Sequence, residues 1–138
     1  MFKKVLLAVD GSKNALRAAE KAGHIASLEK SIVTILYVVD AASSKSEVLS
    51  EGDRAMRDEH RKQRIYPAET LLKEKGIEID LQIKKGEPGP TIASYANENQ
   101  FDLVIVGSRG LNRLQEMVLG SVSHKVAKRA NCPVMIVK

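Results

Sequence analysis

Short apolar segments alternate with longer amphipathic segments along the chain. The apolar segments are rich in Val and Ile and too short to be helices, so they predict strands. There are five of them: Val5–Val9, Ile32–Val39, Ile77–Ile83, Leu103–Val106 and Val134–Val137. The first, second and fourth are apolar at nearly every position, which is typical of parallel strands covered on both faces. The third alternates strictly between apolar and polar residues, so we expect it to be half exposed at an edge of the sheet.

The segments between these strands carry the periodicity of helices. The first helix begins after Ser12, a suitable N-cap, and small or apolar residues repeat along one of its faces. They are Ala15, Ala18, Ala19, Ala22 and Ile25. Shorter helices are expected over residues 91–98 and 121–130. The order β-α-β-α-β-α-β-α-β predicts one α/β domain over residues 1–138, a three-layer α/β/α sandwich of four helices around a five-stranded, mostly parallel sheet.

The remaining helical segment, from about Gly52 to Lys75, contains a proline. The segment ends at Gly76, and glycine is a residue type that commonly terminates helices. Pro67 lies in the interior, where a proline removes a backbone hydrogen bond and clashes with the preceding turn. We therefore expect either a kink or two helices separated by a break near Tyr66. The Ser-rich stretch 41–50, which precedes this segment, is a candidate lid.

Composition excludes several classes of protein. The 138 residues are 43% hydrophobic and 28% charged, which excludes a disordered chain. No apolar run approaches the ~18 residues that a membrane helix needs. The single cysteine, Cys132, cannot form an intramolecular disulfide, and one cysteine with three scattered histidines does not predict a structural zinc site. We expect a cytoplasmic protein without a membrane partner.

The charge pattern does not predict binding to nucleic acid. The net charge is +5, from 22 Lys and Arg against 17 Asp and Glu. Over residues 51–64 the basic residues are interspersed with acidic ones, which is the pattern of a solvated helix face. A nucleic-acid-binding surface usually has charge of one sign with aromatic residues that stack on bases, and only 4% of this chain is aromatic.

Chemistry is expected where the strands end, because ligands of open parallel sheets bind at the carboxyl ends of the strands. Asp10 follows the first strand, and the fourth strand runs into the loop Gly107–Gly110. The segment Gly120–Ser123 then opens the last helix, whose N–H groups and positive dipole end attract an anion. This loop and helix start predict a phosphate cradle, although glycine and serine at these places are also ordinary turn and cap residues.

Four segments carry a more specific pattern: Lys4–Ser12, Val104–Gly110, Leu119–Ser123 and Cys132–Val137. In these segments, and along its whole length, the chain resembles the universal stress protein family. The ATP-binding branch of that family is marked by the pattern G-x2-G-x9-G-[ST], which Gly107, Gly110, Gly120 and Ser121 match without a gap. The resemblance implies a Rossmann-like fold of the adenine nucleotide alpha hydrolase type, and binding of ATP.

The resemblance also implies which residues contact the nucleotide. Ala8, Val9 and Asp10 would contact the adenosine moiety, with Asp10 near the ribose or a metal, and the backbone of Val38 would meet the adenine ring. The phosphate side would be formed by Gly107, Arg109, Gly110, Gly120, Ser121, Val122 and Ser123. Relatives usually bind the nucleotide with Mg²⁺ or Mn²⁺, and one carboxylate with phosphate oxygens and water is sufficient for Mg²⁺. The protein ligands of that metal are not assigned.

The function implied is a stress response in which ATP is a regulatory ligand. The sequence offers no evident arginine finger, water-positioning Gln or catalytic base beside the phosphates, so we assign no catalytic residue and expect slow or no hydrolysis. Binding of AMP or cyclic AMP, a weak ATPase using Asp10 and a metal, and an interaction protein with a vestigial site are alternatives. The last strand, Val134–Val137, would be an apolar edge, and family members pair their last strands, so we expect a homodimer.

Overall fold

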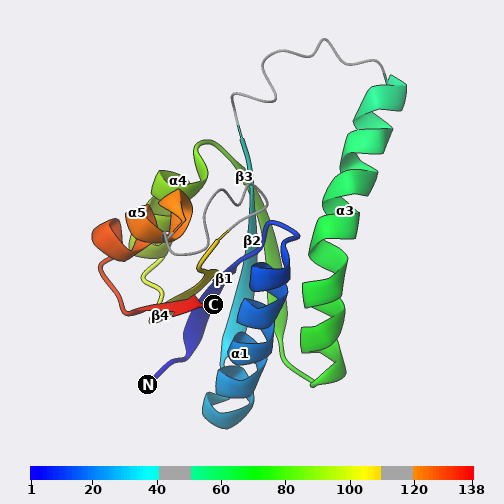
Figure 1. The fold of residues 1–138 in the computed structure, drawn as a ribbon. Helices are drawn as coiled ribbons and strands as arrows, with labels where there is room; N and C mark the ends of the chain where they lie inside the picture. The colour runs from blue at the N-terminus through cyan, green and yellow to red at the C-terminus, as the bar shows by residue number, and fades with distance from the viewer. Residues whose placement is uncertain (41–50, 110–119) are drawn as a thin grey trace.

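The computed structural model describes residues 1–40, 51–109 and 120–138, without the side chains of residues 51–57. Strands and helices alternate within these ranges (Figure 1). The strands are β1 (Lys4–Ala8), β2 (Ile32–Val39), β3 (Ile79–Lys85), β4 (Leu103–Gly107) and β5 (Val134–Val137). The helices are α1 (Lys13–Glu29), α3 (Glu51–Glu74), α4 (Pro88–Glu98) and α5 (Ser121–Arg129). The predicted α/β order is confirmed.

The five strands form one parallel sheet in the order β3-β2-β1-β4-β5. The three strands that are apolar throughout therefore occupy the interior, and the alternating strand β3 lies at an edge, as its sequence predicts. On β3 the side chains of Leu81 and Ile83 are 39% and 44% exposed. The strand begins at Ile79 and ends at Lys85, two residues later at each end than predicted.

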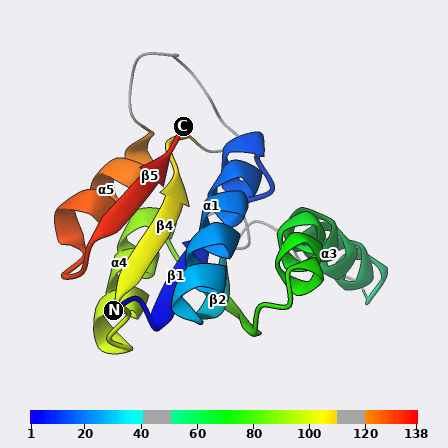
Figure 2. The ribbon, with the colours of Figure 1, turned by 90° about the horizontal axis from the view of Figure 1, so that it is seen from below.

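Within the described residues, α1 and α3 cover one face of the sheet and α4 and α5 cover the other (Figure 2). One core cluster joins α1 and α3 to alternate residues of the strands, including Val5, Leu7 and Ile35. A second cluster joins α4 and α5 to the intervening residues, including Leu6 and Leu36. Successive side chains of a strand point to opposite faces, so continuous apolar runs supply both layers. This arrangement is the predicted three-layer sandwich.

Helix α3 continues through Pro67, so the predicted alternative of two helices is wrong. The buried residues Ile65, Ala68 and Leu72 lie on one face of the helix, before and after the proline, and all join the same core cluster. Pro67 itself is exposed. Tertiary packing on both sides of the proline therefore outweighs the local cost of one missing hydrogen bond. The helix ends where predicted, with Gly76 at a φ of +73° and the Ile77 N–H donating to the Leu72 carbonyl at 3.1 Å.

The two shorter helices lie close to their predicted ranges. Helix α4 begins at Pro88, three residues before the predicted start, because a proline is well suited to the first turn, where its missing N–H has no helical partner. Helix α5 spans Ser121–Arg129. None of the helices within the described ranges is long and apolar enough to cross a membrane.

Candidate functional site

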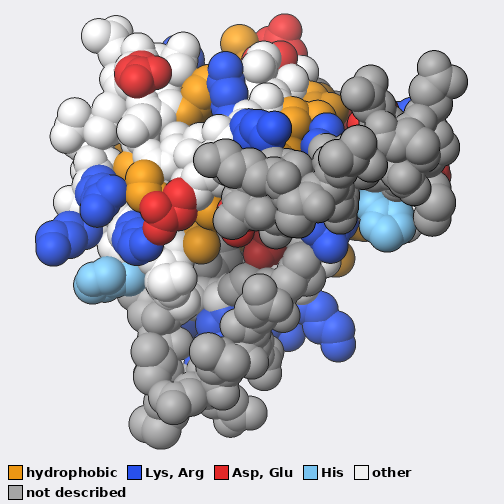
Figure 3. All heavy atoms as spheres, turned by 90° about the horizontal axis from the view of Figure 1, so that it is seen from above, with side chains coloured by type: hydrophobic (Ala, Val, Ile, Leu, Met, Phe, Trp, Pro, Cys, Tyr) orange, Lys and Arg blue, Asp and Glu red, His pale blue; other side chains and the backbone are white. Residues whose placement is uncertain are grey.

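The carboxyl ends of β1, β2 and β4 lie side by side, because these parallel strands are neighbours in the sheet. The predicted site residues Ala8, Val9 and Asp10 lie at the end of β1, and Val38 lies near the end of β2. Figure 3 looks onto this end of the molecule, where Lys and Arg side chains lie interspersed with Asp and Glu side chains.

The loop after β1 is held in shape by its own polar groups. The Asp10 carboxylate accepts a hydrogen bond from the Ser12 N–H at 2.9 Å, and Ser12 Oγ accepts one from the Ala15 N–H at 3.1 Å. Ser12 is therefore the N-cap of α1, as predicted. Val9 is buried and its N–H donates to the Leu36 carbonyl at 3.0 Å. Asp10, which is half-buried, is thus presented at the strand end by a fixed turn.

Arg64 of α3 supports this loop from outside, a contact that sequence reasoning missed. A Cβ atom placed on Gly11, whose φ is +88°, would lie 2.8 Å from Arg64 Cγ and 3.4 Å from its Cα. The Arg64 guanidinium reaches β2, where its Nη1 donates to the Tyr37 hydroxyl at 3.0 Å. Tyr37 is only 6% exposed. Helix α3 therefore packs directly against the loop that carries Asp10.

Ser108, which follows β4, makes hydrogen bonds with three other elements. Its N–H donates to the Val137 carbonyl of β5 at 2.7 Å. Its carbonyl accepts from the Gly120 N–H at 2.8 Å and from Ser123 Oγ at 3.0 Å. Its hydroxyl oxygen accepts from Asn14 Nδ2 of α1 at 3.2 Å. Ser108 is 7% exposed, so these bonds lie in the interior.

The motif glycines Gly107 and Gly120 pack closely around this residue. A Cβ on Gly107 would lie 2.8 Å from Asn14 Cβ and 3.2 Å from the Ala15 backbone nitrogen. A Cβ on Gly120 would lie 2.8 Å from the Ser108 carbonyl oxygen. Neither position has a φ that L side chains rarely adopt. Within the described residues, the need for glycine here comes from close packing of the protein against itself.

The residues of the first turn of α5 differ in exposure. Its N-cap, Gly120, provides no side-chain cap hydrogen bond. Ser121 is exposed and Val122 is half-buried, whereas Ser123 is 1% exposed. The first N–H groups of a helix have no partner within the helix, so a first turn that no described side chain caps is suited to an anion.

The described residues include all of the predicted phosphate side except Gly110. The single O–H of Ser123 is shared between the carbonyl oxygens of Ser108 and Gly120, both at 3.0 Å, so this side chain bonds to the protein's own backbone. Arg109 follows Ser108 and is half-buried. Gly110 lies outside the described residues. Besides Arg64, the sequence did not indicate Asn14 and Ser108, which hold the strand end and the helix start together.

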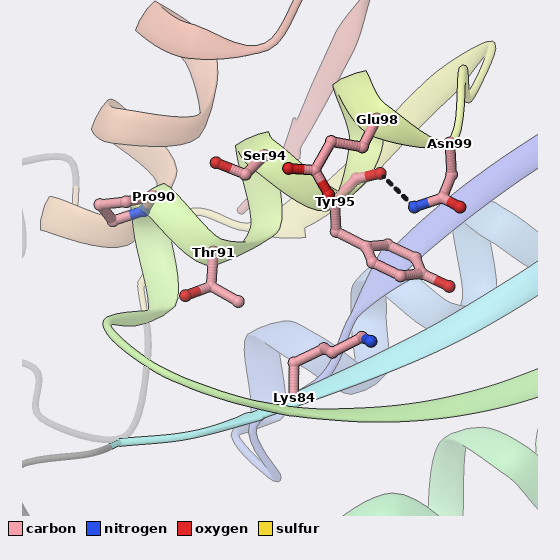
Figure 4. A pocket seen from close by; sticks show the side chains of 7 residues that line it. All are labelled: Lys84, Pro90, Thr91, Ser94, Tyr95, Glu98 and Asn99. Atoms are coloured by element: carbon pink, nitrogen blue, oxygen red, sulfur yellow. Dashed lines mark hydrogen bonds between the residues drawn. The ribbon is translucent and has the colours of Figure 1, made fainter.

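A separate groove runs along α4 and reaches Lys84, the residue of β3 that pairs with Val38 in the sheet (Figure 4). It has a volume of about 590 Å³ and is lined by Lys84, Pro90, Thr91, Ser94, Tyr95, Glu98 and Asn99. Lys84 Nζ lies 5.6 Å from the centroid of the Tyr95 ring, and burial together with the charge of Asp80 raises the pKa of Tyr95. The groove contains none of the predicted site residues.

The whole of this chain matches a known family. Residues 1–138 match the universal stress protein family. The chain belongs to this family. The universal stress protein YxiE of Bacillus subtilis is 36% identical to it over 148 residues, which cover 100% of both proteins. Because the match spans both chains completely, the comparison concerns the whole domain.

Solved structures of similar proteins have the same fold. The hypothetical protein MJ0577 aligns with a TM-score of 0.85 at 30% identity, covering 100% of this universal stress protein and 96% of that chain. A universal stress protein in complex with cAMP aligns with a TM-score of 0.72 at 27% identity, covering 99% and 96%. A family protein from Arabidopsis thaliana with AMP bound aligns with a TM-score of 0.69 at 28% identity, covering 99% and 91%. Relatives with this fold thus bind adenine nucleotides.

Proposed function

We propose that this universal stress protein binds ATP together with Mg²⁺ as a regulatory ligand in a stress response, with slow or no hydrolysis. The observation that carries the proposal is the first turn of α5, which receives no side-chain cap hydrogen bond from Gly120 and is anchored to the end of β4 beside the loop that presents Asp10. The nucleotide would lie across the carboxyl ends of the strands, where open α/β sheets bind their ligands.

The residues divide between the two ends of the nucleotide. Ala8, Val9, Asp10 and Val38 would contact adenosine, and buried Val9 would do so through its backbone. The phosphates would meet Arg109 and the N–H groups at the start of α5, with the Ser121 hydroxyl as a further donor. This division predicts that the adenosine and phosphate contacts respond to different substitutions.

The donor groups fit a metal that is bound mainly through the nucleotide. No group of three or more His, Cys, Asp or Glu side chains in the described part of the chain is placed to hold a metal ion. Asp10 offers one carboxylate, of which Oδ1 already accepts the Ser12 N–H. Mg²⁺ usually keeps several waters and takes one or two carboxylates plus substrate phosphates. Its contribution would be to neutralise phosphate charge beside Asp10.

The alternative ligands are AMP and cyclic AMP, which occupy the two relatives described above. Either nucleotide would use the same adenosine contacts and place only one phosphate near α5. Titration with ATP–Mg²⁺, AMP and cyclic AMP by calorimetry separates the three. ATP bound more tightly than AMP supports the proposal, and equal or weaker binding of ATP favours the alternative.

The first experiment is the chromatographic and mass-spectrometric identification of nucleotide released by denaturing the purified protein. Near-stoichiometric ATP supports the proposal and shows that hydrolysis is slow. ADP that accumulates with time after ATP is added supports the weak ATPase. If no nucleotide is released and none binds when added, the interaction protein with a vestigial site is the better description.

The variant Ser121→Asp tests where the phosphates lie. A carboxylate in the first turn is favourable for the helix dipole, so the fold is expected to be retained. It would repel a nearby phosphate, and we expect ATP affinity to fall about tenfold or more while adenosine affinity is unchanged. The matched control is Ser94→Asp, which adds the same charge on the exposed face of α4. An equal loss in both variants would contradict this position for the phosphates.

We also propose that two copies of the chain associate through β5. This strand is an edge of the sheet, and three of its four residues are half-buried. The Val104 and Ser108 N–H groups donate to the carbonyls of Pro133 and Val137, so alternate backbone groups of β5 face its neighbour β4. The backbone groups of Ile136 then point away from β4, toward a second copy.

This direction of the backbone provides a selective test of the dimer. Ile136→Pro removes an outward N–H without removing a bond to β4, whereas Ile136→Ala truncates the side chain and keeps that N–H. We expect analytical ultracentrifugation to show a dimer for the unchanged protein and for Ile136→Ala, and a monomer for Ile136→Pro. A dimer that persists in Ile136→Pro would place the interface elsewhere.

A further inference from the structure

The end of β4 and the start of α5 are joined through Ser108. Ser108 and Gly120 are separated by eleven residues of sequence, yet the Gly120 N–H and Ser123 Oγ both donate to the Ser108 carbonyl, at 2.8 and 3.0 Å. The start of α5 is thus tied to the end of β4 at two points. Among the described residues, these two hydrogen bonds hold the start of α5 at the end of β4.

Ser108 is also hydrogen-bonded to β5 and to α1. Its N–H donates to Val137 of β5, and its hydroxyl accepts from Asn14, which is 5% exposed. Gly107 allows α1 to approach, because a Cβ there would lie 3.0 Å from the Asn14 carbonyl carbon. Ser108 is therefore a fixed point to which the start of α5 is attached.

We infer that Ser108 and the side chain of Ser123 are positioning residues of the nucleotide site. They hold the first turn of α5 at the distance from the sheet that a phosphate requires, without touching the nucleotide. The inference rests on the proposed function, which supplies the ligand. Its physical basis is that a helix start fixed before binding loses less conformational entropy when the phosphate binds.

Substitution of Ser123 by Ala tests this role without leaving a buried group unpaired. The Ser108 carbonyl keeps its bond from the Gly120 N–H, and the alanine has no polar atom to satisfy. We expect Ser123→Ala to bind ATP roughly three- to tenfold more weakly, the factor that corresponds to one hydrogen bond. Adenosine, which does not reach α5, should bind within about twofold of the unchanged protein.

Hydrogen exchange of the nucleotide-free protein separates positioning from contact. With Ser123→Ala, the Gly120 amide should exchange faster, because one of the two ties to Ser108 is gone. The control is Ser94→Ala, an exposed serine on α4, which should change neither affinity nor the exchange of Gly120. Ser108→Ala, which removes the acceptor for Asn14, should lower the ATP affinity in the same direction.

The outcomes are distinct. Weaker ATP binding with unchanged exchange of the Gly120 amide would mean that the Ser123 hydroxyl contacts phosphate, and would overturn the positioning role. Equal losses of ATP and adenosine affinity would indicate general destabilisation. An unchanged ATP affinity would show that the Ser123–Ser108 hydrogen bond does not affect binding. Either result would overturn the positioning role. If the unchanged protein binds neither ligand, the proposed function itself is wrong.

Discussion

Gly107→Ala adds a single methyl group at the point where β4 passes closest to α1. The new Cβ would lie 2.8 Å from Asn14 Cβ, 3.0 Å from the Asn14 carbonyl carbon and 3.2 Å from the Ala15 nitrogen. Two of these three atoms belong to the backbone of α1, so they can move away only if the start of the helix moves. The backbone of Gly107 itself has no positive φ, so the effect of the substitution is steric.

The expected cost follows from two opposing effects. Overpacking a well-packed interior costs about 1–3 kcal/mol. Replacing glycine by alanine also reduces the freedom of the unfolded chain, which stabilises the fold by about 0.4–1 kcal/mol. The net loss in the free energy of unfolding therefore lies between about 0 and 2.6 kcal/mol, with a middle value of about 1.3 kcal/mol. Urea denaturation followed by circular dichroism should show this as a midpoint roughly 0.5–1 M lower with an unchanged slope.

Gly23→Ala is the matched control, since it is the same substitution in the interior of α1. The atom nearest to the Cβ added at Gly23 would be Lys75 Cδ, at 2.9 Å, which belongs to a flexible, exposed side chain. Alanine also has a higher helix propensity than glycine, by about 0.8–1 kcal/mol. The control midpoint should therefore be unchanged or higher. If Gly107→Ala is as stable as the unchanged protein but binds ATP more weakly, this glycine serves the ligand and our reasoning from packing is refuted.

Three further predictions concern other parts of the fold. Ser12→Ala removes the N-cap of α1 and should lower the free energy of unfolding by about 1 kcal/mol in urea denaturation; no change would mean that the 3.1 Å cap bond contributes nothing. Pro67→Ala restores a backbone donor within the continuous helix α3 and should raise the free energy of unfolding by roughly 1–3 kcal/mol, whereas a loss would show that the proline is required. Burial raises the pKa of the Cys132 thiol, so its alkylation by iodoacetamide should reach half its maximal rate at a higher pH in the native protein than in urea. Because the pKa of the thiol is higher in the native protein than in the unfolded chain, its contribution to the free energy of unfolding is lost as the pH rises through the native pKa. Identical alkylation profiles in the native protein and in urea would contradict the raised pKa.

Features that repeat along the chain could be predicted from the sequence. Continuous apolar runs placed β1, β2 and β4 inside the sheet, and strict alternation placed β3 at an edge. The Ser12 cap was also predictable, because Ser12 and the Ala15 N–H that donates to it are three residues apart and need no knowledge of the fold. Local chemistry and periodicity therefore predicted the elements and the end of the sheet where the site lies.

Contacts between distant residues could not be predicted in this way. Asn14 and Ser108 are 94 residues apart, and nothing in their own surroundings indicates that they meet. One signal was present: Asn14 precedes Ala18 and Ala22 by four and eight residues, so a polar side chain lies on the apolar face of α1. A buried amide on such a face needs a partner, and the nearby strand ends were the place to look.

The common direction of the strands determines how two sites would be arranged in a dimer. A twofold axis perpendicular to the sheet pairs identical edge strands antiparallel, because rotation reverses the direction of the second copy. Pairing of β5 in this way would join the sheets and place the carboxyl ends of the strands at opposite ends of the assembly. Each nucleotide would then lie wholly within one copy, beyond the reach of the other. A partner that senses both nucleotides at once would have to span the whole length of the joined sheet.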